Sequence, residues 1–153
     1  VFGPIDGYAP LIEDAVQRVT QATGLAPLLV CHSMGGLAAR AWLRASSGYA
    51  RVHHVVTIGT PHHGTWPARF SRVANGRQMR IACDWQRQLE RDLPPQQQAL
   101  FTCWYSNCDN IVFPASTATL PGAENRLLRG VAHVRLALHA GVMRDTLSRI
   151  GAA

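Results

Sequence analysis

The sequence of 153 residues contains no lysine, so arginine supplies all 15 of its basic side chains. Nine acidic residues leave a formal charge of +6, and a basic chain can attract nucleic acid or an anionic membrane surface. The arginines are scattered, however, and no stretch interleaves basic and aromatic residues as nucleic-acid motifs do. We therefore expect no nucleic acid among the partners of this chain.

Long apolar runs are missing as well. No stretch reaches the roughly 18 consecutive apolar residues of a membrane-spanning helix, and the first residues lack the basic, apolar and small-residue order of a secretory signal. Hydrophobic residues still make up 47% of the chain, which is typical of a folded globular domain. Because the sequence starts with Val1 and not with methionine, we expect a processed chain or a piece of a longer one.

Cysteine pairs of the CxxC type are absent, which argues against a structural zinc site. No tight ligand spacing occurs among the histidines and acidic residues, so we expect no metal and no other cofactor. Cys31 lies in an apolar run and is expected to be a buried thiol. A disulfide between Cys103 and Cys108, or one that involves Cys83, stays open because cysteine usage does not fix the redox compartment.

Apolar spacing predicts helices that alternate with buried strands. Pro10 and Gly24 suit the start and the stop of the first helix. Continuous apolar or β-branched runs predict strands that are buried on both faces. The predicted helices cover residues 11–22, 35–45 and 139–150, and the predicted strands cover residues 28–31, 52–58, 101–105 and 131–134. This alternation indicates an α/β fold with a mainly parallel sheet of about four strands and flanking helices.

The stretch LLVCHSMGGL, residues 28–37, places a serine between an apolar strand and a helix of small residues. A serine hydroxyl becomes a good nucleophile only beside a base that takes its proton, and it needs N–H donors for the developing oxyanion. A sharp strand-to-helix turn would expose Ser33 and aim the N–H group of Met34 at the reacting atom. The small residues Cys31 and Gly35 let such a turn close. A helix N-cap is the alternative role for Ser33.

Four stretches of the chain resemble bacterial lipases and esterases of the α/β-hydrolase superfamily. They stand in the family's order and cover nearly the whole sequence. They are CHSMGGLAARAWL at the nucleophile turn, VVTIGTPHHGT at the next strand and loop, DNIVFPASTATLPGAEN at the acid loop, and GVAHVRL at the histidine loop. In this family the first motif usually reads GHSMGG, so Cys31 stands where glycine is usual.

The resemblance implies a catalytic triad in the order Ser, Asp or Glu, His. It assigns Ser33 as nucleophile, Asp109 as the acid and His133 as the base, with the Met34 N–H group in the oxyanion hole. Asp109 also follows a predicted strand in a polar loop, and His133 comes before another apolar segment. The alternatives that we weigh for the acid are Asp84, Asp92 and Glu124.

His62 and His63 fall in the loop that, by resemblance, borders the substrate pocket, and a structural role in that loop is the alternative. Residues 66–98 are rich in arginine and form either a lid or an ordinary surface excursion. Their basic charge would help the chain to contact a lipid interface.

The resemblance also indicates that residues 1–153 form one α/β-hydrolase domain that is truncated at its N-terminal side. In the family an upstream loop, often with an HG-type motif, supplies the second oxyanion donor, and no such motif is present here. About four strands would leave one edge of the sheet exposed. We therefore expect a missing N-terminal segment or a partner to complete the sheet.

The favoured function is hydrolysis of carboxylic esters, with a lipid or a short acyl ester as substrate and an acyl-enzyme on Ser33 as intermediate. An acyltransferase or a thioesterase would use the same triad. A hydrolase-like remnant without catalysis is the alternative from another class of protein.

Overall fold

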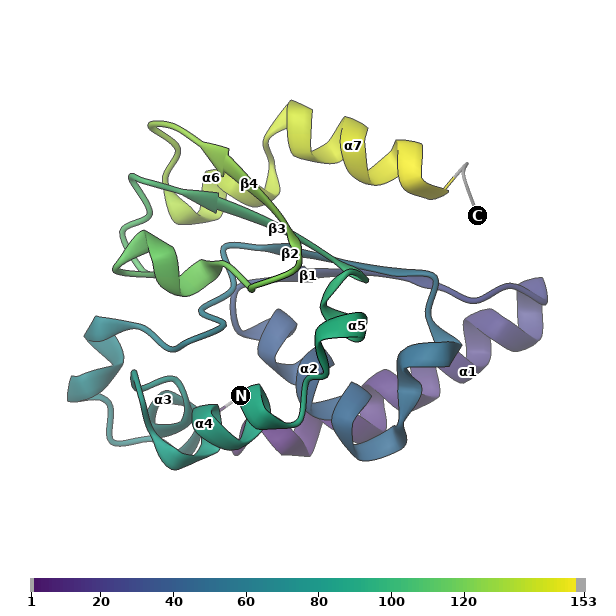
Figure 1. Ribbon diagram of the computed structural model, residues 1–153, viewed down its shortest axis with the longest axis horizontal. Coiled ribbons are helices and arrows are strands. Elements are labelled where there is room, and N and C mark those ends of the chain that lie inside the picture. Colours follow the sequence, from purple (N-terminus) through teal and green to yellow (C-terminus); the bar gives the residue numbers. More distant parts are fainter. Residues whose placement is uncertain (1, 151–153) are drawn as a thin grey trace.

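Four parallel strands form the centre of the computed structural model, which describes residues 2–150. The strands are β1 (Leu28–His32), β2 (His54–Ile58), β3 (Phe101–Ser106) and β4 (Glu124–Leu128). Their order in the sheet is β1-β2-β3-β4, the same as their order in the chain. All four strands therefore end at the same edge of the sheet (Figure 1).

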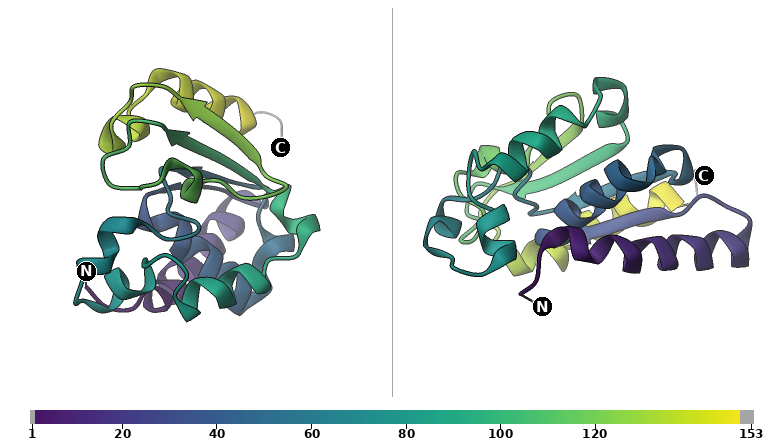
Figure 2. Two further views of the ribbon diagram at one scale, coloured as in Figure 1. Left: turned by 60° about the vertical axis from the view of Figure 1, so that its left-hand side comes forward. Right: turned by 90° about the horizontal axis from the view of Figure 1, so that it is seen from below.

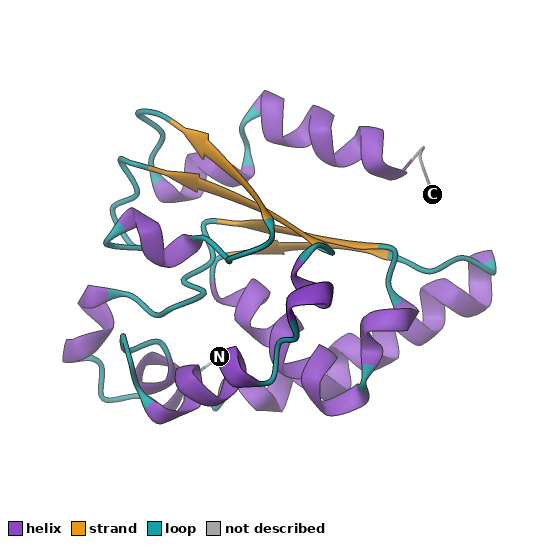
Figure 3. Cartoon of the chain, viewed as in Figure 1, coloured by secondary structure: helices purple, strands orange, loops and turns teal. Residues whose placement is uncertain are grey.

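Helices cover both faces of this sheet (Figure 3). The longer ones are α1 (Ala9–Thr23), α2 (Met34–Ser46) and α7 (Ala140–Ile150). The shorter α-helices are α3 (Ala74–Gln78), α4 (Asp84–Arg91), α5 (Pro95–Gln98) and α6 (His133–Ala137). The 3-10 helices are η1 (Ile5–Tyr8), η2 (Gly48–Arg51), η3 (Trp66–Phe70) and η4 (Ala115–Ala118). None of the described helices is long and apolar enough to cross a lipid bilayer.

The predicted helices and the first three predicted strands are confirmed to within a few residues. In α1, Pro10 lies in the first turn, and Gly24 ends the helix with φ 71° while its N–H group donates to the carbonyl of Thr20. That left-handed conformation costs glycine nothing and would strain other residues. The α/β fold with a parallel four-stranded sheet is likewise confirmed.

The predicted fourth strand at residues 131–134 is wrong. The strand lies earlier, at Glu124–Leu128, and the predicted segment runs into helix α6 (His133–Ala137). β4 has an edge position and carries polar side chains, of which Arg126 pairs with Asp145 of α7. Pairing with β3 and ion pairs hold this strand, so the apolar pattern used for prediction does not mark it.

The core has two layers, one on each face of the sheet. Neighbouring side chains on β2 point to opposite faces, so Val55 packs beneath α1 and α2 while Val56 packs beneath α6 and α7. Figure 2 shows α1 in purple and α7 in yellow on opposite faces. Phe101 and Leu136 are fully buried in these two layers. Burial of side chains of this size stabilises the fold by about 1.5–3 kcal/mol each.

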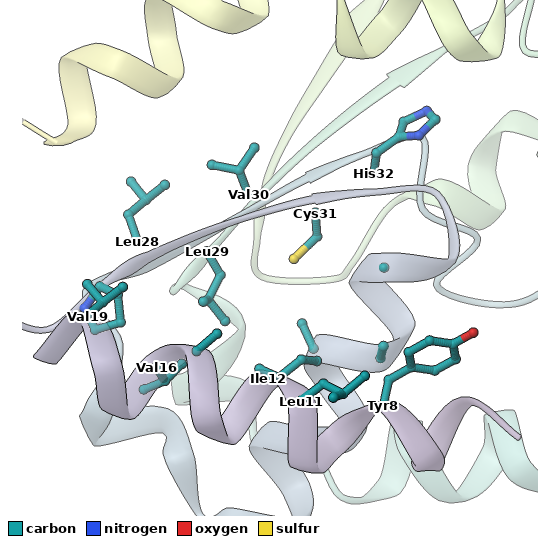
Figure 4. A pocket seen from close by; sticks show the side chains of 15 residues that line it. Tyr8, Leu11, Ile12, Val16, Val19, Leu28, Leu29, Val30, Cys31 and His32 are labelled. Carbon is teal, nitrogen blue, oxygen red and sulfur yellow. The ribbon is translucent and has the colours of Figure 1, made fainter. Parts of the chain in front are cut away.

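One edge of the sheet is open, as the sequence predicts. In the described part of the chain β1 pairs with β2 alone, and the side chain of Val30 is 54% exposed. A groove of about 440 Å³ runs between β1 and α1 and is lined mainly by apolar side chains. Figure 4 shows Leu29 and Cys31 pointing toward α1 and Val30 pointing to the other face.

The segment 66–98 consists of η3, α3, α4 and α5. Its α4 part is tied to the core, because Leu89 packs against Leu37 and Ala38 of α2. Only its first part, η3 and α3, borders the cavity that contains Ser33. A lid function for residues 66–98 stays a prediction.

Candidate active site

The three residues predicted to form a triad lie at the ends of strands, where the parallel sheet collects them at one edge. Ser33 follows β1 directly, Asp109 stands three residues after β3, and His133 opens α6 after β4. Gly59 follows β2, which lies between β1 and β3 in the sheet.

Ser33 has a backbone conformation that residues other than glycine rarely adopt, with φ 54° and ψ −128°. Such strain costs about 1–3 kcal/mol and persists only where neighbouring contacts enforce it. The Ser33 N–H group donates to the carbonyl of Ile58 at 2.9 Å. Ser33 stands at the N-cap position of α2, but its side chain makes no capping hydrogen bond to the helix, and the residue lines a cavity.

Thr60 fixes the other side of this turn. Its hydroxyl donates to the carbonyl of Ser33 at 2.8 Å, and the Thr60 side chain is almost completely buried. Gly36 allows this approach, because a Cβ atom there would lie 2.3 Å from the Thr60 Oγ1 atom. No sequence pattern predicts this role for Thr60, although Thr60 stands in the VVTIGTPHHGT stretch.

The N–H group of Met34 is available for an oxyanion. Met34 is the first residue of α2, and in the described part of the chain its N–H group donates to no acceptor. The N-terminal end of a helix carries a partial positive charge that favours a negative oxygen. Met34 thus has the free donor that its predicted role requires.

Asp109 and His133 form a buried pair. The Asp109 Oδ2 atom lies 2.8 Å from His133 Nδ1, and each side chain is only 3% exposed. The other oxygen, Oδ1, accepts the N–H groups of Ile111 and Val112 at 2.8 Å each. Burial raises the pKa of Asp109, but the hydrogen bonds from His133 and from these N–H groups outweigh it and lower the pKa below its usual range. The ionised carboxylate keeps a proton on Nδ1, so Nε2 is the nitrogen left to act as a base.

Polar side chains just after β3 hold the loop that carries His133. Asn107 Oδ1 accepts the N–H group of Gly130 at 3.0 Å, and Asn110 Oδ1 accepts the N–H group of His133 at 3.3 Å. The stretch that supplies Asp109 therefore also positions the backbone of His133. Neither asparagine was predicted from the sequence, and the only signal for them is their place beside the predicted acid.

The loop that carries Asp109 is fixed in turn by Thr65. The Thr65 hydroxyl donates to the carbonyl of Ile111 at 2.7 Å and accepts the N–H group of Phe113 at 3.0 Å. Thr65 comes from the loop after β2, so that loop braces the acid loop from the side.

Gly59 makes room for the Asp109–His133 pair. Its φ is 57°, and a Cβ atom there would lie 3.1 Å from the His133 ring and 3.3 Å from Asp109 Oδ2. Both the backbone conformation and the space therefore favour glycine at this position.

His32 connects the serine to the histidine loop. Its Nε2 atom lies 3.3 Å from the carbonyl oxygen of His133, which can only accept, so His32 donates this hydrogen bond. The two imidazole rings lie 4.7 Å apart between centroids. Within residues 2–150 Ser33 and His133 make no direct hydrogen bond, and catalytic bonds of this kind commonly tighten only when substrate binds.

Ser33 borders a cavity of about 380 Å³. Met34, η3, α3 and the acid loop form its walls, and most of the lining side chains are apolar. The apolar lining residues include Met34, Ala68, Val73, Met79, Ile111 and Val112. Ser33 therefore borders a space that suits an apolar chain.

The structure does not bring His62 or His63 to this cavity. His62 is fully buried, its Nε2 atom lies 3.0 Å from Thr57 Oγ1, and its carbonyl accepts a hydrogen bond from Arg40. Burial, and then the charge of Arg40, lower the pKa of His62 well below its usual value. His63 pairs with Glu90 at the surface. These contacts fit the structural alternative, and a substrate-binding role has no contact that supports it.

The three carboxylates weighed against Asp109 lie elsewhere. Asp84 is fully exposed beside Arg87, and Asp92 faces Arg44. Glu124 binds the arginines of β4 and α7.

All four cysteines are free thiols, so the disulfides left open by the sequence are not formed. Burial raises the pKa of Cys31 to about 12, which leaves this thiol protonated and unreactive at neutral pH. A Cβ atom on Gly35 would lie 3.9 Å from the Cβ atom of Cys31, so the turn holds a small side chain here. Within residues 2–150 no three histidine, cysteine or acidic side chains are grouped to hold a metal ion.

Comparison with known proteins gives a family and a fold. Residues 10–146 match the family model described as "PGAP1-like alpha/beta domain". The mature Bacillus licheniformis lipase BlEst2 superposes with a TM-score of 0.80 at 17% identity, over 95% of this chain and 75% of that one.

Two further lipases have the same fold. Aspergillus fumigatus lipase B gives a TM-score of 0.69 at 20% identity, over 83% of this chain and 35% of that one. The monoacylglycerol lipase of Paleococcus ferrophilus gives a TM-score of 0.66 at 11% identity, over 97% of this chain and 77% of that one. At these identities the likeness shows the fold, which is the α/β-hydrolase fold of lipases and esterases that the sequence motifs predict.

Proposed function

Because the chain belongs to the PGAP1-like alpha/beta domain family and has the α/β-hydrolase fold of lipases, we propose that it hydrolyses carboxylic esters through an acyl-enzyme on Ser33. The observation that carries the proposal is the buried Asp109–His133 pair, placed at the same sheet edge as the strained turn of Ser33. A nucleophile, an oriented base and a free N–H donor are the parts that acyl transfer needs.

In the first half of the reaction, Ser33 Oγ attacks the carbonyl carbon of the ester while His133 Nε2 takes the hydroxyl proton. The carbonyl oxygen becomes an oxyanion that the Met34 N–H group stabilises. Asp109 stabilises the imidazolium through Nδ1–H. The C–O bond of the ester then breaks, and Nε2 returns its proton to the departing alcohol.

In the second half, water attacks the acyl-enzyme and gives its proton to His133 Nε2. The second oxyanion collapses, the bond between the acyl carbon and Ser33 Oγ breaks, and the proton returns to the serine. The products are the free acid and the regenerated hydroxyl of Ser33.

The cavity supports an apolar acyl group as the part of the substrate held next to Ser33. Its walls are mainly aliphatic and methionine side chains, and its volume is about 380 Å³. The three solved structures compared above are described as lipases. A lipid or a short acyl ester is therefore the proposed substrate class.

Labelling with a fluorophosphonate tests the nucleophile. We expect the probe to label the intact chain and not the Ser33→Ala variant, and hydrolysis of p-nitrophenyl esters to fall by at least about 10⁴-fold in that variant. Ser71→Ala is the matched control, because Ser71 borders the same cavity without belonging to the proposed triad.

Absence of labelling on a folded chain would overturn the proposal and favour a remnant without catalysis. Labelling of Ser33 without ester turnover would instead direct the assay to acyl thioesters and to acceptors other than water. A series of p-nitrophenyl esters of increasing chain length then measures how much acyl chain the cavity accepts.

A further inference from the structure

The segment that borders the Ser33 cavity has an unusual charge distribution. Residues 61–83 contain four arginines and no acidic residue. Two of these arginines, Arg69 and Arg72, are exposed in and directly after η3. The charge of both is therefore available to an anionic partner.

Exposed aromatic rings accompany this charge. Trp66 and Phe70 of η3 are 49% and 68% exposed, and their rings meet edge to face with centroids 5.6 Å apart. The Arg69 guanidinium lies 4.9 Å from the centroid of each ring. Stacking on both rings orders the arginine side chain beside the aromatic pair.

The same surface continues to the acid loop. The backbone N–H group of Trp66 donates to the backbone carbonyl of Phe113 at 2.8 Å, and Phe113 is 58% exposed. Pro67 and the buried Ala68 of η3 line the cavity that contains Ser33. The aromatic and basic groups therefore lie outside one wall of the proposed active site. We call Trp66, Arg69, Phe70, Arg72 and Phe113 the rim surface.

We propose that the rim surface docks the chain onto an anionic lipid surface. This proposal rests on the proposed function, because docking would bring Ser33 to ester substrates in the lipid. Tryptophan and phenylalanine rings insert at the boundary between headgroups and acyl chains. Each arginine near an anionic leaflet is attracted by its surface potential. Residues 61–83 contain no acidic side chain that would repel an anionic surface.

A lipid surface accounts for the combination better than a folded protein partner. The rim surface joins exposed apolar rings and unopposed positive charge at the wall of an apolar cavity. An acyl chain that leaves an anionic bilayer beside η3 would pass from one apolar environment to another without crossing water.

Vesicle sedimentation of the whole chain tests this proposal. We expect binding to vesicles of phosphatidylcholine mixed with phosphatidylglycerol, and binding weaker by at least about ten-fold to vesicles of phosphatidylcholine alone. Raising the salt concentration is expected to weaken the binding to the mixed vesicles. Arg69→Glu/Arg72→Glu and Trp66→Ser/Phe70→Ser are each expected to weaken it by about ten-fold or more.

Arg18→Glu/Arg144→Glu is the matched control, since it changes the net charge equally at exposed positions of α1 and α7. An equal loss in this control would assign the binding to net charge and overturn the proposal, as would unchanged binding in both rim variants. Capture by a protein partner with no affinity for either vesicle would overturn it too.

Fluorophosphonate labelling separates this proposal from the proposed function. A chain that is labelled at Ser33 but does not sediment with vesicles would overturn the docking surface alone. A chain that sediments but is not labelled would overturn the hydrolase alone. Ser33→Ala is expected to bind the mixed vesicles as tightly as the unaltered chain.

Discussion

Thr60 illustrates how one hydroxyl can set the geometry at a proposed nucleophile without contacting its side-chain oxygen. Its Oγ1 atom donates to the carbonyl oxygen of Ser33, not to the reactive side chain. That carbonyl belongs to the peptide unit whose N–H is the proposed oxyanion donor of Met34. Because the peptide unit is planar, fixing its oxygen also fixes the direction of this N–H group.

We expect Thr60→Val to lower kcat for a short p-nitrophenyl ester by about ten-fold while KM changes little. Valine keeps the shape of threonine but cannot donate, so the Ser33 carbonyl keeps only the longer hydrogen bond from the Gly36 N–H group, at 3.2 Å. Steady-state kinetics together with thermal unfolding measure both effects. Thr60→Ser restores the hydroxyl and should recover most of the rate. Equal loss in Val and Ser variants would show that packing, and not the hydrogen bond, matters here.

At the scale of elements, one carboxylate ties α1 to its neighbours. Glu13 of α1 accepts the indole N–H of Trp42 at 2.8 Å and binds Arg51 through both of its oxygens. The hydrogen bonds from Arg51 and then from Trp42 lower the pKa of Glu13 from 4.5 to about 2. A lowered pKa in the folded chain means that this stabilisation is complete above about pH 4.5 and is lost as the pH falls toward 2.

Glu13→Gln is therefore expected to lower the melting temperature at pH 7, with a difference from the unaltered chain that shrinks as the pH falls from 4.5 to 2. Thermal unfolding followed by circular dichroism across this range is the measurement. Asp14→Asn, on the same helix in an exposed pair with Arg18, should leave the melting temperature nearly unchanged. A difference that grows toward acid pH would contradict the assignment.

Elements that bury a periodic or continuous apolar pattern were predictable, because the local sequence of α1, α2 and the first three strands contains that pattern. The edge strand β4 does not, since Arg126 and its ion partner on α7 replace apolar burial. Motif resemblance predicted Ser33, Asp109 and His133 as a triad, but it did not indicate the side chains that hold their loops. Contacts such as Asn110 with the His133 backbone join positions 23 residues apart and leave no periodic trace.

At the scale of the whole molecule, we expect the open edge of the sheet at β1 to determine how readily the chain self-associates. Within residues 2–150, β1 presents an unpaired edge beside an apolar groove, and an exposed apolar edge is a site of self-association. Charged side chains on edge strands oppose such pairing because a second strand would bury them. The solubility of the chain should therefore depend on this strand more than on its net charge of +6.

We expect Val30→Lys to raise the concentration at which the chain aggregates and to leave the melting temperature almost unchanged, since Val30 is already half exposed. Light scattering against concentration measures the effect. Leu147→Lys adds the same charge on α7, far from the edge strand in sequence, and serves as the control. Equal improvement in both variants would point to general charge repulsion.

Gly59 offers a way to recognise catalysis in sequences alone. Its positive φ is tolerated by asparagine as well as by glycine, but a Cβ atom there would crowd the His133 ring at 3.1 Å and the Asp109 carboxylate at 3.3 Å. If the proposed function holds, a descendant that abandoned catalysis and lost its histidine would be released from this second restriction. Asparagine at the position of Gly59 would thus mark a lineage that kept the fold and gave up the chemistry, even where the serine itself had survived.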